Sequence, residues 1–261
     1  MKRVLFMFYA ILCYLAFLAT FFYAIGFVTG IGVPTTLDGG AANPATTPFW
    51  TALAVDAALL TVFALQHSVM ARKGFKEWWT KIVPKPIERS TYVLFASAAL
   101  ALLFWQWRPL GGTLWNVTGA ERTALLALSM AGWLIVFIST WLTSHWDLFG
   151  LRQAWLYVTG KENAGLEFTT RGFYRFVRHP IYLGFTIAFW ATPHMTVGHL
   201  VFAVATLAYM LVAIQLEERD LVRIYGDAYR AYRERVSMLV PLPPAVPESG
   251  EKTLEEKLKE A

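Results

Sequence analysis

Two short polar motifs with complementary chemistry interrupt an otherwise apolar chain. Residues 178–184 read Arg-His-Pro-Ile-Tyr-Leu-Gly, and a pair of glutamates follows at 217–218. Pro180 favours the first turn of a helix, which would place Arg178 and His179 beside backbone N–H groups that lack helical partners. Such a helix start can bind a carboxylate, whereas a glutamate pair can bind an ammonium ion. Each motif alone is equally typical of an ordinary membrane helix start or of an amphipathic helix at a membrane surface.

Aromatic residues follow the glutamate pair at helical spacing. Tyrosine faces attract cations. An anion site, an ammonium site and aromatic walls together complement S-adenosylmethionine, which carries a carboxylate, an ammonium and a sulfonium group, although they do not single it out. One helix from 217 to 235 would present the relevant side chains on a single face, namely Glu218, Leu221, Tyr225, Tyr229 and Tyr232.

Three histidines are expected at a similar depth in the membrane. His67 and His145 fall near the ends of two apolar segments, and His179 falls at the start of a third. Ionisable side chains are costly inside a bilayer, so function is the default interpretation, and capping of a helix C-terminus is the alternative. Asp56 precedes His67 by eleven residues, about three helical turns, so both should project from one face. Asp56 could instead merely pair near the outer surface.

The elements that must position these residues are membrane helices. The chain is 56% hydrophobic and 16% charged, with 11 Trp and 19 Phe in 261 residues. A membrane span needs about 20 apolar residues. We therefore predict an all-α, polytopic transmembrane helix bundle with a cytosolic C-terminal helix. It has four spans plus a C-terminal helical hairpin split by Pro193, five to six membrane segments in all, from the apolar runs 4–33, 49–71, 91–107, 123–144 and 180–216.

The distribution of positive charge predicts the topology. Residues 33–48 and 197–200 contain no Lys or Arg, whereas 72–89, 152–178 and 219–235 are rich in them. The positive-inside rule therefore places both termini in the cytosol. Topology and anionic membrane lipids explain the basic residues better than nucleic acid does.

One membrane domain accounts for the chain. We expect it to cover residues 1–240, with the cofactor-binding part at 171–240 and a polar tail at 241–261. The basic start resembles a signal peptide, but its apolar run is too long and lacks a cleavage site, so a retained helix is predicted. The single cysteine, Cys13, excludes an intramolecular disulfide and argues against a Cys-based metal site or thiol catalysis. No ligand cluster demands a metal.

Both polar motifs resemble the C-terminal region of a superfamily of membrane methyltransferases. It includes the isoprenylcysteine carboxyl methyltransferases and the phospholipid N-methyltransferases, and the resemblance covers about the last third of the domain. One departure is Gln215, where that superfamily often has an arginine. The resemblance implies S-adenosylmethionine bound at the cytosolic face. We predict a cofactor site made of Tyr174, Arg178, His179, Pro180, Tyr182, Gly184, Glu217, Glu218 and Tyr229.

The N-terminal half is similar to one branch, the bacterial methanethiol S-methyltransferases. The similar segments are 64–72, 88–92, 103–109 and 159–163. The branch implies an enzyme of the bacterial inner membrane that methylates the small thiol methanethiol to dimethyl sulfide. Membrane lipids are its only other expected partners, and no obligatory protein partner is evident. In-line transfer to a thiolate needs a base, for which the candidates are His67, His145 and Asp147, with Glu88 and Arg89 close in sequence. We favour His67 as base or orienting residue.

Other interpretations remain open at this stage. His67 and His145 on separate spans could supply two axial ligands to a haem. In that interpretation the glutamate pair has no role. A methyltransferase could also act on a prenylated cysteine, a phospholipid or another small thiol. Bulky lipid acceptors need a lateral opening between helices, which the sequence does not reveal.

Overall fold

The structure, a computed structural model, describes residues 1–162 and 170–241. Residue 163 and the tail from 242 onwards, both named above, lie outside these residues. Within them, five helices are long and apolar enough to cross a membrane: α1 (Lys2–Thr29), α2 (Phe49–Ala71), α4 (Lys85–Gln106), α5 (Gly119–Thr143) and α9 (Val197–Tyr225). The shorter elements are α3 (Lys73–Trp79), β1 (Thr113–Asn116), α6 (His145–Leu148), α7 (Leu151–Thr159), the 3₁₀-helix η1 (Gly172–Arg175), α8 (Pro180–Trp190), β2 (His194–Thr196) and α10 (Asp227–Arg235). The chain is therefore an all-α polytopic integral membrane protein, as its sequence predicts.

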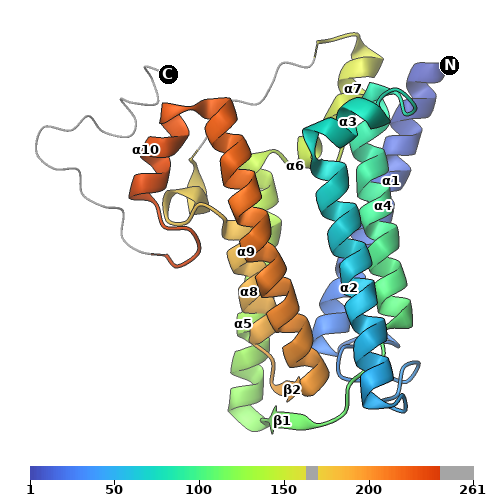
Figure 1. The fold of residues 1–261 in the computed structure, drawn as a ribbon, viewed down its shortest axis with the longest axis vertical. Coiled ribbons are helices and arrows are strands. Elements are labelled where there is room, and N and C mark those ends of the chain that lie inside the picture. The colour runs from blue at the N-terminus through green and yellow to red at the C-terminus, as the bar shows by residue number, and fades with distance from the viewer. Residues whose placement is uncertain (163–169, 242–261) are drawn as a thin grey trace, which may run out of the picture.

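The long helices form two groups that stand side by side (Figure 1). α1 and α2 both pack against α4, and α5 packs against α8, which in turn contacts α9. The N-terminus, α3, α6, α7 and α10 lie at one end of the bundle, called here the N-terminal end. The β1–β2 pair lies at the other, called the sheet end. The two polar motifs lie at the start of α8 and towards the end of α9, so both belong to the second group of helices.

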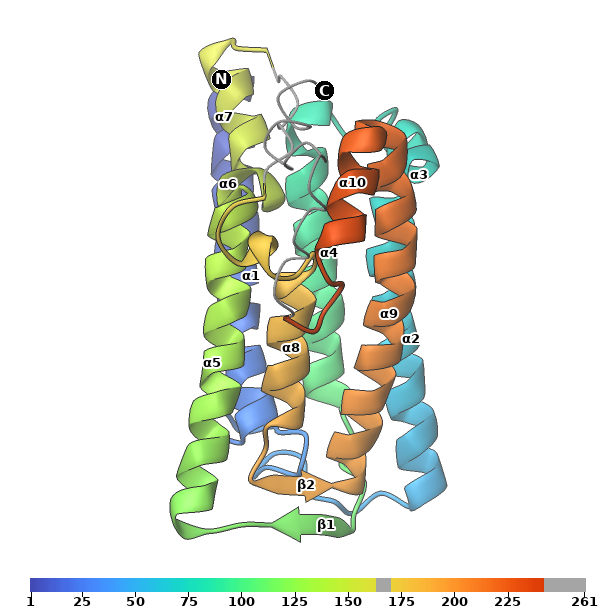
Figure 2. The same ribbon diagram turned by 90° about the vertical axis from the view of Figure 1, so that its left-hand side faces the viewer.

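α8 is the short arm of the predicted hairpin. α8 ends at Trp190 and α9 begins at Val197, so the break at Pro193 is confirmed. The eleven residues of α8 rise only about 16 Å, roughly half of the hydrocarbon thickness of about 30 Å. η1 and the start of α8 consequently lie inside the bundle rather than at its N-terminal end (Figure 2). His179, at the start of α8, is therefore farther from the N-terminal end of the bundle than the sequence indicated.

Two glycines let α8 pack closely against α5. A methyl group on Gly184 would lie 2.6 Å from the carbonyl oxygen of Gly132, and one on Gly132 would lie equally close to the carbonyl oxygen of Gly184. The Ser129 hydroxyl donates to the Ala188 carbonyl over 2.9 Å in the same interface. Gly184 was predicted to belong to the cofactor site. In the structure its neighbours are Gly132 and Val136 on α5.

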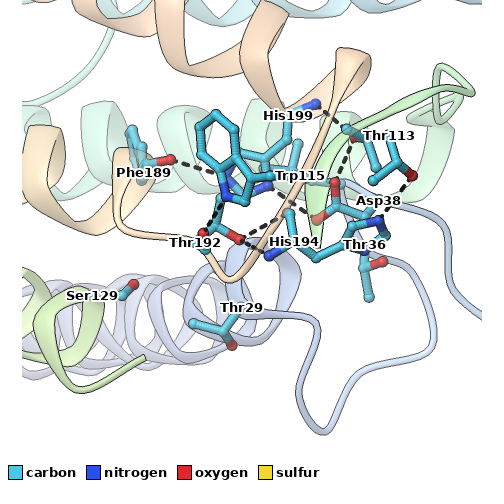
Figure 3. A network of polar contacts seen from close by, with 12 residues as sticks. Thr29, Thr36, Asp38, Thr113, Trp115, Ser129, Phe189, Thr192, His194 and His199 are labelled. Carbon is cyan, nitrogen blue, oxygen red and sulfur yellow. Dashed lines mark hydrogen bonds and ion pairs between the residues drawn. The ribbon is translucent and has the colours of Figure 1, made fainter. Parts of the chain in front are cut away.

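A polar network fastens the sheet end (Figure 3). Asp38 accepts hydrogen bonds from the Thr196 hydroxyl at 2.6 Å and from Nδ1 of His199 at 3.0 Å, while Nε2 of His199 lies 2.9 Å from the Phe189 carbonyl oxygen. Both ring nitrogens of the fully buried His199 thus face acceptors, an arrangement that a doubly protonated ring satisfies. The network ties the loop after α1 to the turn between α8 and α9. Sequence patterns did not predict it.

The predicted continuous helix from 217 to 235 is wrong. α9 ends at Tyr225, and Gly226 adopts φ 56°, a left-handed conformation that favours glycine. After this break α10 runs back along α9 (Figure 2). Tyr229 and Tyr232 therefore approach Glu218 by folding back rather than by sharing one helical face with it.

Asp56 and His67 both face α4 and the segment that follows it. The fully buried Asp56 accepts a hydrogen bond from the backbone N–H of Arg108 over 2.9 Å, whereas His67 contacts Tyr92 on α4. The shared face is as expected. Asp56 serves to anchor the chain just after α4, which is the pairing alternative that the sequence left open.

Candidate active site

A buried carboxylate organises the start of α8. Glu218 on α9 accepts hydrogen bonds from Nε of Arg178 at 2.7 Å and from Nε2 of His179 at 3.1 Å. The side chains of Arg178 and Glu218 are 10% and 6% exposed, so these charge-assisted bonds are shielded from water. The two polar motifs of the sequence are thus brought into direct contact.

The chain after α10 closes over this cluster. Nη1 of Arg178 donates to the carbonyl oxygens of Arg233, at 3.0 Å, and of Val236. The backbone N–H groups of Arg178 and His179 donate to the carbonyls of Ser237 and Met238 at 2.8 and 3.2 Å. The sequence assigned these side chains and backbone donors to a ligand carboxylate. In the structure their bonds go to Glu218 and to residues 237–238 instead.

Glu217 is the open member of the glutamate pair. Its side chain is 46% exposed, and its Oε2 accepts from the Tyr182 hydroxyl at 3.3 Å and lies 3.8 Å from Nδ1 of His179. Glu218 is neutralised by Arg178 and His179, so Glu217 carries the negative charge available to a cationic ligand. The predicted site residues on α8 and α9 therefore separate into a structural pair and an accessible carboxylate.

Tyrosines line the polar side of this cluster. The Tyr232 hydroxyl donates to the Tyr174 carbonyl over 2.6 Å, and the Tyr174 hydroxyl lies 2.6 Å from that of Thr143 on α5. Burial, with the nearby carboxylates of Glu218 and Glu217, raises the pKa of Tyr229. Burial likewise raises the pKa of Tyr174. These phenols therefore stay neutral and offer aromatic faces rather than charge.

A second cluster surrounds His67 at the N-terminal end of the other helix group. The Tyr92 hydroxyl lies 2.9 Å from Nε2 and 3.0 Å from Nδ1 of His67. The Arg89 guanidinium sits 4.8 Å from the centre of the Tyr92 ring and donates through Nε to the Leu148 carbonyl at 2.8 Å.

His145, another candidate base, is occupied by structural bonds. The Thr140 hydroxyl, 2.8 Å from Nδ1, donates to the Phe137 carbonyl and so accepts from Nδ1. Nε2 then accepts from the Tyr14 hydroxyl at 2.8 Å, and the ring stacks on Trp141. Burial lowers the pKa of His145. This geometry favours a neutral ring that joins α5 and α6 to α1, and it leaves neither nitrogen open to a substrate or a haem iron.

The acidic candidates lie outside the His67 cluster. Asp147 pairs with Arg152 at 2.9 Å and accepts from Gln153 at 3.1 Å. Glu88 lines a surface depression of about 510 Å³ between α3 and α4, and its Oε1 is buried without a hydrogen-bond partner. Gln215 is exposed on α9. Among the described residues, no group of three or more His, Cys, Asp or Glu is arranged to hold a metal ion.

Two contacts escaped the sequence patterns. Tyr92 was not among the predicted site residues, yet its hydroxyl lies 2.9 Å from Nε2 of the favoured histidine. Its position three residues after Arg89 places both side chains on one helical face, which is the signal that could have revealed it. The pairing of residues 178–179 with 237–238 had no such signal, because nothing in either segment marks the other.

Five apolar helices make the chain an integral membrane protein, and its similarity to known proteins makes it a methyltransferase. The family described as Phospholipid methyltransferase matches residues 123–228, which cover most of α5 and all of α8, α9 and the glutamate pair. The chain belongs, more narrowly, to the methanethiol S-methyltransferase family.

Relatives over nearly the whole chain establish this membership. A methanethiol S-methyltransferase of Crocosphaera subtropica is 52% identical over 242 residues, 92% of this chain and 93% of that protein. One from Mycobacterium tuberculosis is 54% identical over 244 residues, 93% of this chain and 98% of that protein. Nurim of Xenopus laevis is 30% identical over 183 residues, 67% of this chain and 64% of that protein. No solved structure matches the chain significantly.

Proposed function

We propose that this protein transfers a methyl group from S-adenosylmethionine to methanethiol, forming dimethyl sulfide. The observation that carries the proposal is its identity of 52% and 54%, over almost the full chain, to proteins named for that acceptor. The accessible Glu217 carboxylate and the His67–Tyr92 pair supply the matching chemistry.

The described residues fit a cationic methyl donor. Glu217 has the negative charge and the accessibility that an ammonium ion needs, and Tyr182 provides aromatic surface for a sulfonium. Bound there, S-adenosylmethionine would supply an electrophilic methyl group. Arg178 and His179 hold Glu218 in place, so their role is to keep the start of α8 and the end of α10 together. We assign them to building the site rather than to holding the donor's carboxylate.

His67 is the proposed base. The Tyr92 hydroxyl oxygen accepts the N–H of one ring nitrogen and donates its own proton to the His67 carbonyl oxygen at 3.4 Å, so the other ring nitrogen keeps its lone pair and can accept the thiol proton. The thiol S–H bond breaks, its proton moves to the His67 ring, and the sulfur lone pair becomes the nucleophile. The Arg89 guanidinium stacks on the Tyr92 ring and keeps the phenol hydroxyl beside the His67 ring. Asp147, Glu88 and His145 have no part in this step.

The reaction is placed on the cytosolic side of a bacterial inner membrane. Lys and Arg are abundant in the segments at the N-terminal end of the bundle, where the N-terminus, α3, α7 and α10 lie. A cytosolic N-terminal end gives the site access to a cytosolic methyl donor. The acceptor is small and apolar enough to arrive through the bilayer.

A headspace assay tests the proposal. Purified protein in detergent, given S-adenosylmethionine and methanethiol, should produce dimethyl sulfide. His67→Gln should still bind the donor by calorimetry and lose turnover by about 100-fold or more, the usual contribution of a general base. His194→Gln, at the sheet end, is the matched control and should keep turnover.

Two other results would count against it. Turnover retained in His67→Gln would remove this residue from the mechanism. Donor binding without any dimethyl sulfide would exclude methanethiol as acceptor and point to a phospholipid or a prenylated cysteine.

A further inference from the structure

α2 and α9 carry the two halves of the proposed site and lie next to each other. His67 is on α2 and Glu217 is on α9, and side chains of the two helices come into contact. α2 packs mainly on α4, whereas α9 packs on α8 and α10. The line where α2 meets α9, called here the α2–α9 seam, therefore joins the two helix groups beside the reacting residues.

Two polar contacts cross this seam. The Ser68 hydroxyl lies 3.1 Å from the Tyr209 hydroxyl, directly next to His67 in the chain. One helical turn further on, Arg72, which directly follows α2, pairs with Asp220 on α9 at 3.1 Å. Phe63 adds an edge-to-face contact with the Tyr209 ring, at 6.4 Å between ring centres.

The hydroxyl contact is the stronger candidate for holding the seam. Arg72 and Asp220 have side chains 41% and 48% exposed, so water and salt weaken their attraction. Ser68 and Tyr209 are half-buried within spans, where a polar group that loses its partner has few substitutes. Opening the seam would leave both hydroxyls without this bond.

We propose that the Ser68–Tyr209 hydrogen bond latches the α2–α9 seam and restricts the methyl acceptor to small thiols. The inference rests on the proposed function. A long-chain acceptor bound beside His67 must pass its chain out between helices into the bilayer, and a latched seam denies it that path. A one-carbon thiol needs no such opening. Ser68 and Tyr209 are then specificity-determining residues that need not touch methanethiol.

The test compares acceptors of different length on the purified protein. kcat/KM is measured for methanethiol, butanethiol and dodecanethiol in the unaltered protein, in Ser68→Ala, in Tyr209→Phe and in the double variant. Each single variant removes the same hydrogen bond, so each should raise the dodecanethiol to methanethiol ratio about fivefold, the factor expected for one net hydrogen bond. The double variant should raise it no further, because the bond is already lost.

Control variants remove hydroxyls that do not cross the seam. Thr61 on α2 and Thr206 on α9 each bond a carbonyl of their own helix at 2.7 Å. Thr61→Val and Thr206→Val should leave the acceptor ratio unchanged.

A second readout does not depend on catalysis. Spin labels at Val62→Cys and Val212→Cys, both lipid-facing positions, report the α2–α9 separation in a Cys13→Ala background. Their distance distribution should broaden towards longer values when Tyr209→Phe is added.

The outcomes distinguish a failure of the proposed latch from a failure of the proposed function. Unchanged ratios and distances in an enzyme that makes dimethyl sulfide overturn the latch alone. An unaltered protein that methylates no thiol overturns the proposed function and the latch with it.

Discussion

The Arg178 guanidinium and the Glu218 carboxylate meet at 2.7 Å although forty residues separate them in the chain. The contact joins the first turn of α8 to the point where α9 leaves its apolar stretch. It also leaves Glu217, the next residue, as the accessible negative charge. Glu218 thus holds the site together, and the carboxylate of Glu217 is accessible to a ligand.

The two glutamates should respond differently to neutralisation. Glu218→Gln leaves Arg178 and His179 buried without their counter-charge and should cost about 3 kcal/mol of folding stability or more. Glu217→Gln should change stability by no more than about 0.5 kcal/mol and weaken S-adenosylmethionine binding about tenfold, because a charge-assisted contact is lost. Thermal unfolding and calorimetry in one detergent measure both effects. Equal loss of stability in both variants would refute this division of roles.

Tyr92 should act through His67. Tyr92→Phe removes the hydroxyl that contacts the histidine ring but keeps the surface on which Arg89 stacks. We expect kcat to fall about tenfold, with donor binding unchanged, since the base loses its orientation rather than its presence. Tyr23→Phe, which removes a hydroxyl bonded to Thr35 at the sheet end, is the control and should keep kcat. A kcat equal to that of the unaltered protein would show that His67 needs no partner.

Stability should fall in mild acid because of His145. Burial holds the pKa of the folded His145 below its ordinary value of 6.5, so the unfolded chain binds more protons at this site. The free energy of unfolding therefore rises with pH in this window: the contribution is complete above about pH 6.5 and is lost as pH falls below it. Unfolding measured between pH 8 and pH 5 should show a shallower acid slope in His145→Gln. Parallel slopes in the two proteins would contradict this.

The contact between α5 and α8 should tolerate no added carbon. Gly184→Ala puts a methyl group 2.6 Å from the Gly132 carbonyl oxygen, so α8 must move or the protein must lose stability, by roughly 1–3 kcal/mol for such overpacking. Gly74→Ala is the matched control, since its methyl group meets nothing within 4 Å. Thermal unfolding of the two variants distinguishes them. Similar unfolding temperatures would mean that α5 and α8 separate more easily than their packing suggests.

The membrane helices were predictable and their ends were not. Apolar runs mark the spans because the hydrocarbon thickness sets a minimum length, and Pro193 marked the turn of the hairpin. The break at Gly226 was missed because the 217–235 segment keeps a helical pattern on both sides of it. A single left-handed glycine was enough to reverse the direction of the chain.

The site was predictable in composition but not in pairing. Arg178, His179 and Glu218 were expected together, but residue types and spacing do not distinguish bonds among these side chains from bonds to a ligand. Which of the two occurs depends on where in the bundle α8 starts. It also depends on the carbonyl oxygens of residues 237–238, which accept from the backbone N–H groups of Arg178 and His179. His67 could be singled out as an ionisable group in a span, whereas its contact with Tyr92 depends on how α2 packs on α4.

The brevity of α8 also determines from which phase the enzyme draws its acceptor. Because α8 rises only about 16 Å, the polar cluster at its start lies among the helices rather than at the N-terminal end of the bundle. Apolar thiols partition from water into hydrocarbon, so a site at this place in the bundle can draw methanethiol from the membrane. If the protein has the proposed function, its rate at subsaturating methanethiol would depend on the concentration of the thiol in the lipid rather than in water.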